Sequence, residues 1–523
     1  MNEVNHNVPY DIIVIGGALS GAATALLAKR QAPELRILIV ERSEEFKRRV
    51  GESTVEISSY FLGNVLGLTD YLQEHHLNKQ GLRFWFQNED STCLDSCSEI
   101  GPHYNVKLAS YQVDRAKLDE HVLGLCVREG IELLRPCVVK DFELNAGGTQ
   151  RVSLKKGDER LQLGARWLVD CSGVSRILAR KSGWLQRNES HPISTAWVRW
   201  RGVKSWDDPE IRKCFPDFAK RCYARRNTAT NHLIGRGWWA WWITLKGGDV
   251  SIGIVYDERL VELPAGDKPI DRFKGLLYQH PIAPILLKEA SCVDGDFHWR
   301  RHMPYSSRQM VGDGFALVGD AAGFIDPFYS SGMDWISFTS FGTADLIVRE
   351  RQNRVMPEDY TARNELLLGS YQHWFESIYK NKYYYMGDWE LMRIAFKLDL
   401  GLYYLGIVSQ PYRLGDSSFN AAPLNGPYTR FPAWLITTYN RRLAAIGQMR
   451  MKRGTWGKCN DRHYFAFNSF SFDKSLLFRV IGSLFAWLLL ELKEGWRSWG
   501  RPVKDAAVSQ STSASVAGSD RSQ

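Results

Sequence analysis

The sequence predicts a mixed α/β (α+β) fold, in which a domain built on a parallel sheet is interrupted by a mostly antiparallel sheet and followed by a helical C-terminal region. A buried strand at 11–15, a helix at 20–31 and a second buried strand at 36–40 form a βαβ unit near the start of the chain. Alternating, aromatic strands follow between 190 and 300, a pattern typical of antiparallel sheet. A strand that runs into a turn at 314–320 then returns to the first pattern.

The remaining elements follow in chain order. Strands are expected at 80–86, 104–113, 131–143, 151–155, 167–170, 194–201, 237–245 and 250–255. Helices are expected at 115–129, 333–349, 350–410, 433–450 and 474–497, with a loop at 411–430. These elements predict a discontinuous first domain at 1–185 and 300–350, a sheet domain at 186–299 with part of 80–110, a helical region at 351–505, and a serine-rich, disordered tail at 506–523.

Composition excludes several classes of protein. Hydrophobic residues make up 44% and charged residues 24% of the 523 positions, which excludes a largely disordered or multi-span membrane chain. The net charge of +9 comes from short, scattered basic groups, so we expect no nucleic-acid partner. The nine cysteines form no C-x-x-C pair, which predicts no metal site and a reduced, cytoplasmic location. The first residues lack the regions of a signal peptide, which favours the same location.

The C-terminal helix has two interpretations. Its core, Val480–Leu490, is apolar over about 11 residues, whereas a spanning helix needs roughly 20. We expect a helix buried in the protein. The alternative is peripheral membrane or partner contact through 476–499, because Trp487, Trp496 and Trp499 with flanking basic residues suit an interface.

A glycine turn follows the first strand. Gly16, Ala18 and Gly21 occupy the three positions of a G-x-G-x-x-G motif, with alanine at the second. This motif provides a tight turn, a close approach of backbone to a pyrophosphate, and close packing of helix on strand. Glu41 ends the second strand, where a carboxylate can accept hydrogen bonds from ribose hydroxyls. These residues predict a Rossmann-like dinucleotide-binding domain.

Three later motifs indicate which dinucleotide the domain binds. They are Val113–Asp119, which contains Arg115, Asp170–Gly173, and Gly319–Gly323, which contains Asp320. In this order they resemble the FAD-dependent monooxygenase superfamily. The resemblance implies an FAD-binding domain in which Arg115 and Asp320 lie beside FAD. Since no second strong glycine fingerprint appears for NAD(P)H, we expect reduced FAD to come from a separate flavin reductase.

Four further segments narrow the resemblance. They are Gly51–Thr54 (GEST), Lys79–Phe84 (KQGLRF), Trp239–Thr244 (WAWWIT) and Asp326–Gly332 (DPFYSSG). Over roughly residues 10–345 the chain resembles the flavin-dependent halogenases, including the tryptophan halogenases. The resemblance implies that reduced FAD, O₂ and chloride or bromide give hypohalous acid, and that Lys79 delivers the halogen to an electron-rich ring.

The resemblance also implies roles for individual residues. Ser331 and Gly332 are expected at the halide, with Gly332 also beside the flavin. Trp239 and Trp241 are expected to separate flavin from substrate, with core packing as the alternative. Glu52 is a candidate catalytic base.

The sequence departs from the family pattern in three places. Thr244 replaces an expected proline, Tyr329 stands where tryptophan-specific enzymes carry glutamate, and Met333–Trp335 replaces an apolar residue followed by histidine. Without the glutamate, a phenolic or pyrrolic ring, free or tethered to a carrier protein, is a better substrate than free tryptophan. The tyrosine-rich segment 375–404 is expected either to roof the substrate cavity or to form helical core.

Two other functions remain open at this stage. Thr244 and Met333–Trp335 are compatible with a monooxygenase (hydroxylase) or another flavin redox enzyme on the same scaffold. A binder of flavin or of a lipid-like ligand without catalysis is the third reading, with the C-terminal helix as its docking element.

Overall fold

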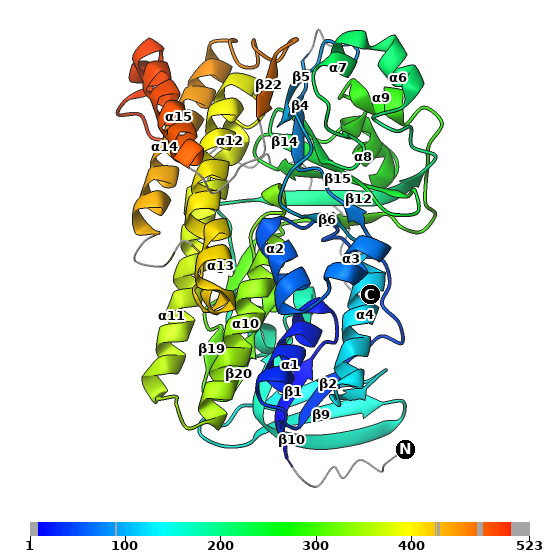
Figure 1. The fold of residues 1–523 in the computed structure, drawn as a ribbon, viewed down its shortest axis with the longest axis vertical. Coiled ribbons are helices and arrows are strands. Elements are labelled where there is room, and N and C mark those ends of the chain that lie inside the picture. Colours follow the sequence, from blue (N-terminus) through cyan, green and yellow to red (C-terminus); the bar gives the residue numbers. More distant parts are fainter. Residues whose placement is uncertain (1–8, 89–91, 424, 426–428, 468–473, 504–523) are drawn as a thin grey trace.

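The computed structural model describes residues 9–88, 92–423, 425, 429–467 and 474–503. Two large sheets follow one another along the long axis of the molecule (Figure 1). Long helices from the C-terminal third stand along one side of both sheets. The predicted α/β fold, with an interrupting sheet and a helical C-terminal region, is confirmed. The predicted tail at 506–523 lies outside the described residues.

The first sheet has eight strands and a parallel centre. Its path runs β19-β20-β10-β1-β2-β7, and the pairs among β20, β10, β1, β2 and β7 are all parallel. The antiparallel strands β8 and β9 extend it beside β10. The bounds are β1 Tyr10–Ile15, β2 Ile37–Val40, β7 Glu132–Leu134, β8 Val138–Glu143, β9 Gln150–Lys156, β10 Glu159–Asp170, β19 Val311–Gly312 and β20 Phe315–Leu317.

Three helices cover this sheet, and all begin at the end where the predicted site residues gather. They are α1 (Leu19–Gln31), α4 (Arg115–Arg128) and α10 (Gly332–Arg351). The side chains of α1 are small and ten of its thirteen residues are buried, so α4 and α10 both pack closely against it. The crossover helix therefore lies inside the domain, as a helix that is apolar on all sides requires.

The second sheet has nine strands and is mostly antiparallel. Its path runs β16-β12-β15-β14-β13-β4-β5-β22, with β17 beside β12, and only β13·β4 and β5·β22 are parallel among its described pairs. The bounds are β4 Leu82–Phe86, β5 Ser98–Pro102, β12 Ile193–Arg201, β13 Thr230–Gly235, β14 Trp238–Thr244, β15 Val250–Asp257, β16 Ser291–Cys292, β17 His298–Arg300 and β22 Tyr464–Phe467.

Three strand predictions are wrong in extent, and the one at 167–170 is only the end of β10, which begins at Glu159. The strand expected at 104–113 is present only as β6 (Tyr111–Gln112), because β5 at Ser98–Pro102 supplies the ladder beside β4. The strand expected at 131–143 is broken between β7 and β8 at Pro136, which has no N–H to give to a ladder.

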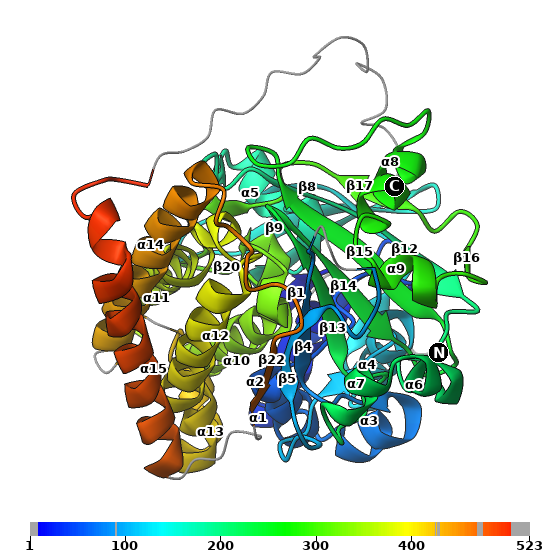
Figure 2. The same ribbon diagram turned by 90° about the horizontal axis from the view of Figure 1, so that it is seen from above.

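Helices dominate beyond residue 350. The long ones are α11 (Pro357–Trp374), α12 (Trp389–Tyr403), α14 (Arg430–Lys452) and α15 (Lys474–Lys493). Figure 2 shows α12, α14 and α15 together on one side of the molecule. The expected loop at 411–430 is partly helical, since α13 covers Ser409–Leu414 and a 3-10 turn covers Asp416–Asn420.

Shorter elements complete the described chain. The helices are α2 Glu56–Tyr60, α3 Thr69–His75, α5 Ile177–Lys181, α6 Pro209–Cys214, α7 Pro216–Lys220, α8 Pro269–Leu277 and α9 Ile282–Leu286. The strands are β3 Leu77–Asn78, β11 Leu185–Arg187, β18 Tyr305–Ser307 and β21 Gly323–Phe324.

The expectation of a fully buried C-terminal helix is wrong for α15. Leu476, Val480 and Leu490 are buried on its inner side, whereas Phe485 is 61% and Leu492 72% exposed. The helix is largely apolar, and among the described residues its packing partners, such as α12, lie on one side of it, because it lies at the edge of the helical layer (Figure 2). Within the described ranges, no helix combines the length and the apolar character that crossing a bilayer requires.

The turn between β1 and α1 needs glycine for two separate reasons. Gly16 has φ +100°, and a Cβ there would lie 2.5 Å from the carbonyl oxygen of Cys171. At Gly21 a Cβ would lie 1.9 Å from the carbonyl oxygen of Gly16. The first glycine therefore permits the turn, and the second lets the helix approach the strand.

The close approach at Gly21 predicts a loss of stability when a methyl group is added. Gly21→Ala is expected to lower the free energy of unfolding by about 1–3 kcal/mol or more, because backbone must move to remove the overlap. Gly482→Ala in α15 is the matched control, since nothing lies within 4 Å of its added Cβ. Alanine is also favoured over glycine in a helix, so the control keeps or raises stability. Urea unfolding of both variants measures the difference, and equal stabilities would contradict the packing argument.

Candidate active site

Two of the predicted motifs meet at the amine of Lys79. This residue directly follows β3 and is 2% exposed. Its Nζ donates to Ser53 Oγ at 2.8 Å and to the carbonyl oxygen of Thr54 at 2.7 Å, both in the GEST segment. An ammonium has three N–H groups, and Lys79 also lines a cavity, so one N–H is left for a molecule in that cavity.

Burial changes the acid–base chemistry of this amine. Desolvation lowers the pKa of Lys79 to about 8, and the nearby carboxylates of Glu56 and Asp334 oppose that change. Lys79 therefore carries a substantial neutral fraction in mildly alkaline solution, unlike a surface lysine. Both the ammonium and the free amine are accessible forms of this group near neutral pH.

The cavity in front of Lys79 encloses about 860 Å³, part of it open to solvent. Its roof comes from the end of α11, the π-helical turn Phe375–Tyr379 and α12. The roof residues are Trp374, Ile378, Tyr379, Phe396, Asp399, Leu400, Tyr403 and Tyr404. The segment 375–404, expected either to roof the substrate cavity or to form helical core, thus lines a cavity and also contributes buried core.

Two carboxyl groups face the cavity beside Lys79, and the sequence reasoning missed both as site residues. Asp334 accepts from Tyr403 Oη at 2.9 Å and from the backbone N–H of Ser58 at 3.0 Å. Burial raises its pKa to about 7, although these hydrogen bonds act in the opposite direction. Glu56 accepts from Tyr404 Oη at 2.6 Å. A proton acceptor with a pKa near neutrality thus lies in the same cavity as the amine.

A third carboxylate, Asp399, anchors another wall of the cavity. It accepts from Lys382 Nζ at 2.6 Å and from Tyr329 Oη at 3.0 Å, and the hydroxyl of Tyr439 also donates to it. The Asp399 carboxylate is paired with the buried amine of Lys382 and fixes the hydroxyl of Tyr329. Tyr329, the residue that departs from the tryptophan-specific pattern, therefore has a fixed hydroxyl.

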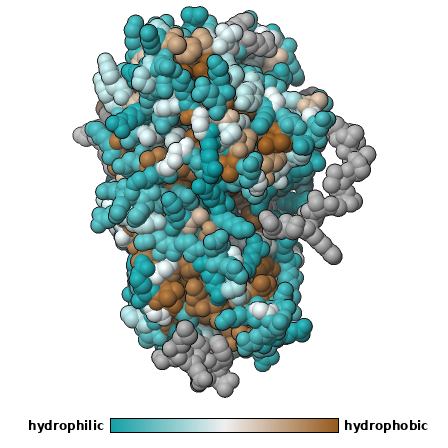
Figure 3. All heavy atoms as spheres, turned by 90° about the vertical axis from the view of Figure 1, so that its right-hand side faces the viewer, coloured by the Kyte–Doolittle hydropathy of each residue, from teal (hydrophilic) through white to brown (hydrophobic). Residues whose placement is uncertain are grey.

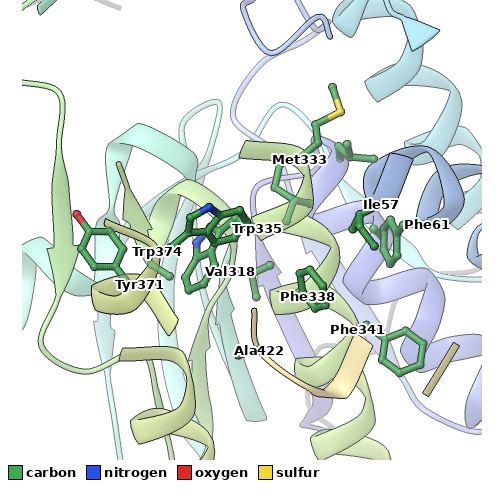
Figure 4. Packing of buried hydrophobic residues seen from close by; sticks show 14 of the residues in the cluster. Ile57, Phe61, Val318, Met333, Trp335, Phe338, Phe341, Tyr371, Trp374 and Ala422 are labelled. Atoms are coloured by element: carbon green, nitrogen blue, oxygen red, sulfur yellow. The ribbon is translucent and has the colours of Figure 1, made fainter. Parts of the chain in front are cut away.

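A smaller cavity of about 350 Å³ adjoins the first. Its lining includes Asp320, Gly332 and Trp335, and it shares Ser331 and Trp374 with the larger cavity. Figure 4 shows Trp335, from the start of α10, near Trp374, from the end of α11. The two cavities therefore adjoin and share part of their wall, Ser331 and Trp374.

The DPFYSSG loop that forms this wall is strained. Tyr329 and Ser330 have φ values of 67° and 61°, the left-handed region that side-chain-bearing residues rarely occupy. Asp326 fixes the start of the loop, because it accepts from Tyr383 Oη at 3.0 Å and lies 2.9 Å from His191 Nε2. The loop leads directly into α10, a 20-residue helix whose first N–H groups lie at Gly332. The positive end of that helix therefore faces the smaller cavity.

The predicted dinucleotide residues gather around the glycine turn. Glu41 accepts from the N–H of Gly17 at 2.8 Å, which holds its carboxylate at the turn. Arg115 donates to Asp119 at 3.1 Å, and Asp119 also accepts from the N–H of Leu19 at 3.3 Å, directly after Ala18.

Asp320 completes this group on the far side of the turn. Burial raises its pKa, and the charge of Arg115 opposes the change, so these two predicted residues act on each other. A Cβ at Gly332 would meet nothing within 4 Å, so the backbone there borders open space. The turn, the carboxylate at the end of β2, the arginine and the open backbone together fit a bound dinucleotide.

Glu52 does not take the expected place, and its assignment as a cavity base is corrected here. Its carboxylate is buried and accepts from Arg199 Nη2 at 2.8 Å, and Arg199 also binds Asp296 at 2.8 Å. Among the described residues that line the two cavities, Glu52 is absent. Burial raises the pKa of Glu52 while Arg199 lowers it. The side chain instead fixes the segment that carries Ser53 and Thr54.

Trp239 and Trp241 lie behind the loop. Trp239 donates from Nε1 to Tyr383 Oη at 2.9 Å and packs against Phe328 with ring centroids 5.1 Å apart. Trp241 donates to Ser251 Oγ at 3.2 Å. Neither tryptophan is among the described residues that line the cavities, so the contacts correspond to the core-packing alternative. Thr244 simply ends β14.

These features define an α/β protein of the dinucleotide-binding class with two adjoining cavities. A sequence profile of the tryptophan halogenase family matches residues 11–109 and 101–382, which is more than half of the chain. The chain belongs to this family.

Individual relatives are more distant. The flavin-dependent halogenase chlA of Dictyostelium discoideum is 28% identical over 372 residues, which cover 64% of this chain and 59% of that protein. The chain thus spans less than two thirds of that relative. The tetracycline 7-halogenase of Kitasatospora aureofaciens is 25% identical over 80% of this chain and 79% of its own length. The solved structure of halogenase PltM in complex with phloroglucinol and FAD superposes with a TM-score of 0.73 at 18% identity, over 94% of this chain and 99% of that one, which shows a shared fold.

The charge of Asp334 acts on the amine of Lys79 in the larger cavity, so its removal should change the pKa of Lys79. Asp334→Asn keeps the shape of the side chain but removes a negative charge that stabilises the ammonium, so the pKa of Lys79 should fall below about 8. Competitive acetylation across pH, quantified at Lys79 by mass spectrometry, should then show half-reaction at a lower pH.

Asp70→Asn, at an exposed position, is the control and should leave the titration curve of Lys79 unchanged. Acetylation of the exposed Lys213, measured in the same digest, corrects for differences in the concentration and reactivity of the reagent. An Asp334→Asn curve that coincides with the parent curve would refute the coupling.

Proposed function

We propose that this chain is an FAD-dependent halogenase that uses chloride or bromide, O₂ and reduced FAD to halogenate an electron-rich aromatic ring. The observation that supports the proposal is the amine of Lys79, which faces a cavity that adjoins the one on the dinucleotide side and shares Ser331 and Trp374 with it. Hypohalous acid formed in the smaller cavity would thus reach Lys79 by passing this shared wall.

The FAD would be held by the glycine turn, Glu41, Arg115, Asp320 and the open backbone at Gly332. When bound and reduced, FAD would activate O₂, which is the oxidant that converts halide to hypohalous acid. The single glycine fingerprint supports a separate flavin reductase as the source of reduced FAD. Ser331 and Gly332 would hold the halide, because the N-terminal end of α10 favours an anion.

Lys79 then controls where the halogen goes. As an ammonium, its third N–H donates to the oxygen of hypohalous acid and makes the halogen more electrophilic. As a free amine, it exchanges one N–H for an N–halogen bond and releases water. Hypohalous acid gives its halogen to the ring, and its oxygen leaves with the ring proton as water. The haloamine gives its halogen to the ring, and the ring proton restores its N–H. In either case Lys79 returns to its starting form.

The carboxyl groups opposite Lys79 support a phenolic or pyrrolic substrate, either free or bound to a carrier protein. Asp334, with its pKa near 7, is placed to take the proton that leaves the ring or its hydroxyl group. The apolar and tyrosine side chains of α12 would hold the ring face. Relatives named for carrier-bound pyrrole chlorination and for sulochrin halogenation agree with this range of substrates.

The first test needs no aromatic substrate. Anaerobically reduced, FAD-loaded enzyme is mixed with O₂ in a stopped-flow instrument, with and without bromide or chloride. We expect halide to change the rate of flavin reoxidation in a saturable manner, with hypohalous acid trapped by monochlorodimedone. Reoxidation that ignores halide over a wide concentration range would overturn the proposal and favour a hydroxylase on the same scaffold.

The second test distinguishes a role of Lys79 in the larger cavity from a role on the dinucleotide side. Lys79→Ala should reduce halogenation of a phenolic or pyrrolic probe by a factor of about 10² or more, because the group that activates the halogen is lost. FAD content and the halide effect on reoxidation should remain, since Lys79 is not part of the dinucleotide side. Lys79→Met, which preserves shape, should behave alike, and Lys213→Ala at an exposed lysine should behave as the parent. Halogenation retained in both Lys79 variants would exclude this role.

A further inference from the structure

The outer side of α15 carries a continuous apolar stripe. Its members are spaced three or four residues apart, so they share one face of the helix and of the turn that follows it. Each of them is between 51% and 72% exposed: Leu477, Ile481, Phe485, Leu488, Leu492 and Trp496. We call this set the α15 stripe. An exposed apolar face of this length marks an interaction surface rather than ordinary surface residues.

Acidic and basic residues of the same segment lie on different sides: the acidic ones face the protein, and the basic ones are exposed. Glu491 turns inward and binds Arg442 of α14 at 2.8 Å, and Glu494 also turns inward toward Arg450. The basic residues Lys493, Arg497 and Arg501 are exposed. The acidic groups are therefore neutralised by α14, and the outer side combines apolar side chains with cations.

Tryptophan and basic residues alternate where the stripe ends. Trp496 and Trp499 are 52% and 61% exposed, and the guanidinium of Arg497 lies 5.1 Å from the ring centre of Trp496. Amphipathic rings beside cations are typical of the boundary between acyl chains and headgroups. By contrast, the side of the molecule turned away from α15 is mostly hydrophilic, with apolar residues in separate patches (Figure 3).

We propose that the α15 stripe docks the protein on the surface of an anionic lipid bilayer. The helix would lie in the plane of the interface, with Phe485 and its neighbours among the acyl chains and Lys493, Arg497 and Arg501 at the headgroups. This is contact from one side, since no described helix meets the requirements for crossing a bilayer. Docking would place the enzyme where apolar aromatic substrates concentrate.

A second copy of the chain fits the same surface less well. Two stripes packed together would bring two sets of exposed cations to one interface without exposed acidic partners from this segment, since Glu491 and Glu494 are already paired. Anionic headgroups supply the missing charge, so the membrane is the partner that the charge pattern favours.

Vesicle sedimentation of the full chain tests the proposal. The protein should sediment with mixed vesicles of phosphatidylcholine and phosphatidylglycerol, and about tenfold or more weakly with phosphatidylcholine alone. The double variant Phe485→Glu with Leu488→Glu should lose binding to mixed vesicles by about tenfold or more, because it puts two charges into the apolar face. Both positions are more than half exposed, so thermal unfolding should match that of the parent.

Met356→Glu is the matched control, because Met356 is an equally exposed apolar residue, 66% exposed, at the start of α11. It should bind vesicles as the parent does. Parent protein that stays in the supernatant, a double variant that sediments like the parent, or equal binding to neutral vesicles would overturn the proposal. So would a parent dimer that the double variant dissociates, which would assign the stripe to a second copy. No stripe residue lines either cavity, so these outcomes are independent of halogenation.

Discussion

A lysine amine inside a protein is stable only where protein acceptors replace the water that it has lost, because burial disfavours both its charge and its unpaired N–H groups. At Lys79 those acceptors are Ser53 and Thr54, and their positions depend on a few backbone contacts. The N–H of Thr54 donates to Tyr111 at 2.9 Å, and β3 pairs with β6 directly before Lys79. The Glu52 to Arg199 ion pair fixes the same segment from the other side. The position of the Lys79 amine is thus set by the two-stranded sheet of β3 and β6 and by the segment that carries Ser53 and Thr54.

The buried amine also determines which polar groups can lie near it in the cavity. Carboxyl groups can remain close to it because each charge lowers the cost of burying the other, and tyrosine hydroxyls complete their hydrogen bonds. The outcome is an amine and an acid whose pKa values, about 8 and about 7, lie close together. Neither value would arise for these residue types in water.

Sequence patterns predict local features of this protein better than long-range ones. The βαβ unit, the glycine turn and the motif around Lys79 are contiguous in the chain, so their spacing alone indicates their structure. The place of Glu52 could not be predicted, because an acid in a motif does not reveal its partner Arg199, which lies 147 residues away. The sequence shows Asp334 only as part of a departure from the family pattern. Its place in the cavity depends on a hydrogen bond with Tyr403, which joins helices that are distant in sequence. The exposure of α15 depends on which neighbours the helix lacks, and an apolar sequence does not show that.

The start of α10 serves both cavities at once. Asp334 faces the larger cavity and Trp335 the smaller one, because successive residues of a helix point about 100° apart. A substitution that shifts this helix to suit a new ring also displaces the wall of the dinucleotide side. In the roof, Trp374 of α11 also lines both cavities, whereas Phe396 and Leu400 of α12 line only the larger one. The larger cavity can therefore change shape at these positions of α12 without disturbing the smaller one, and variation among related sequences should gather there rather than at the start of α10.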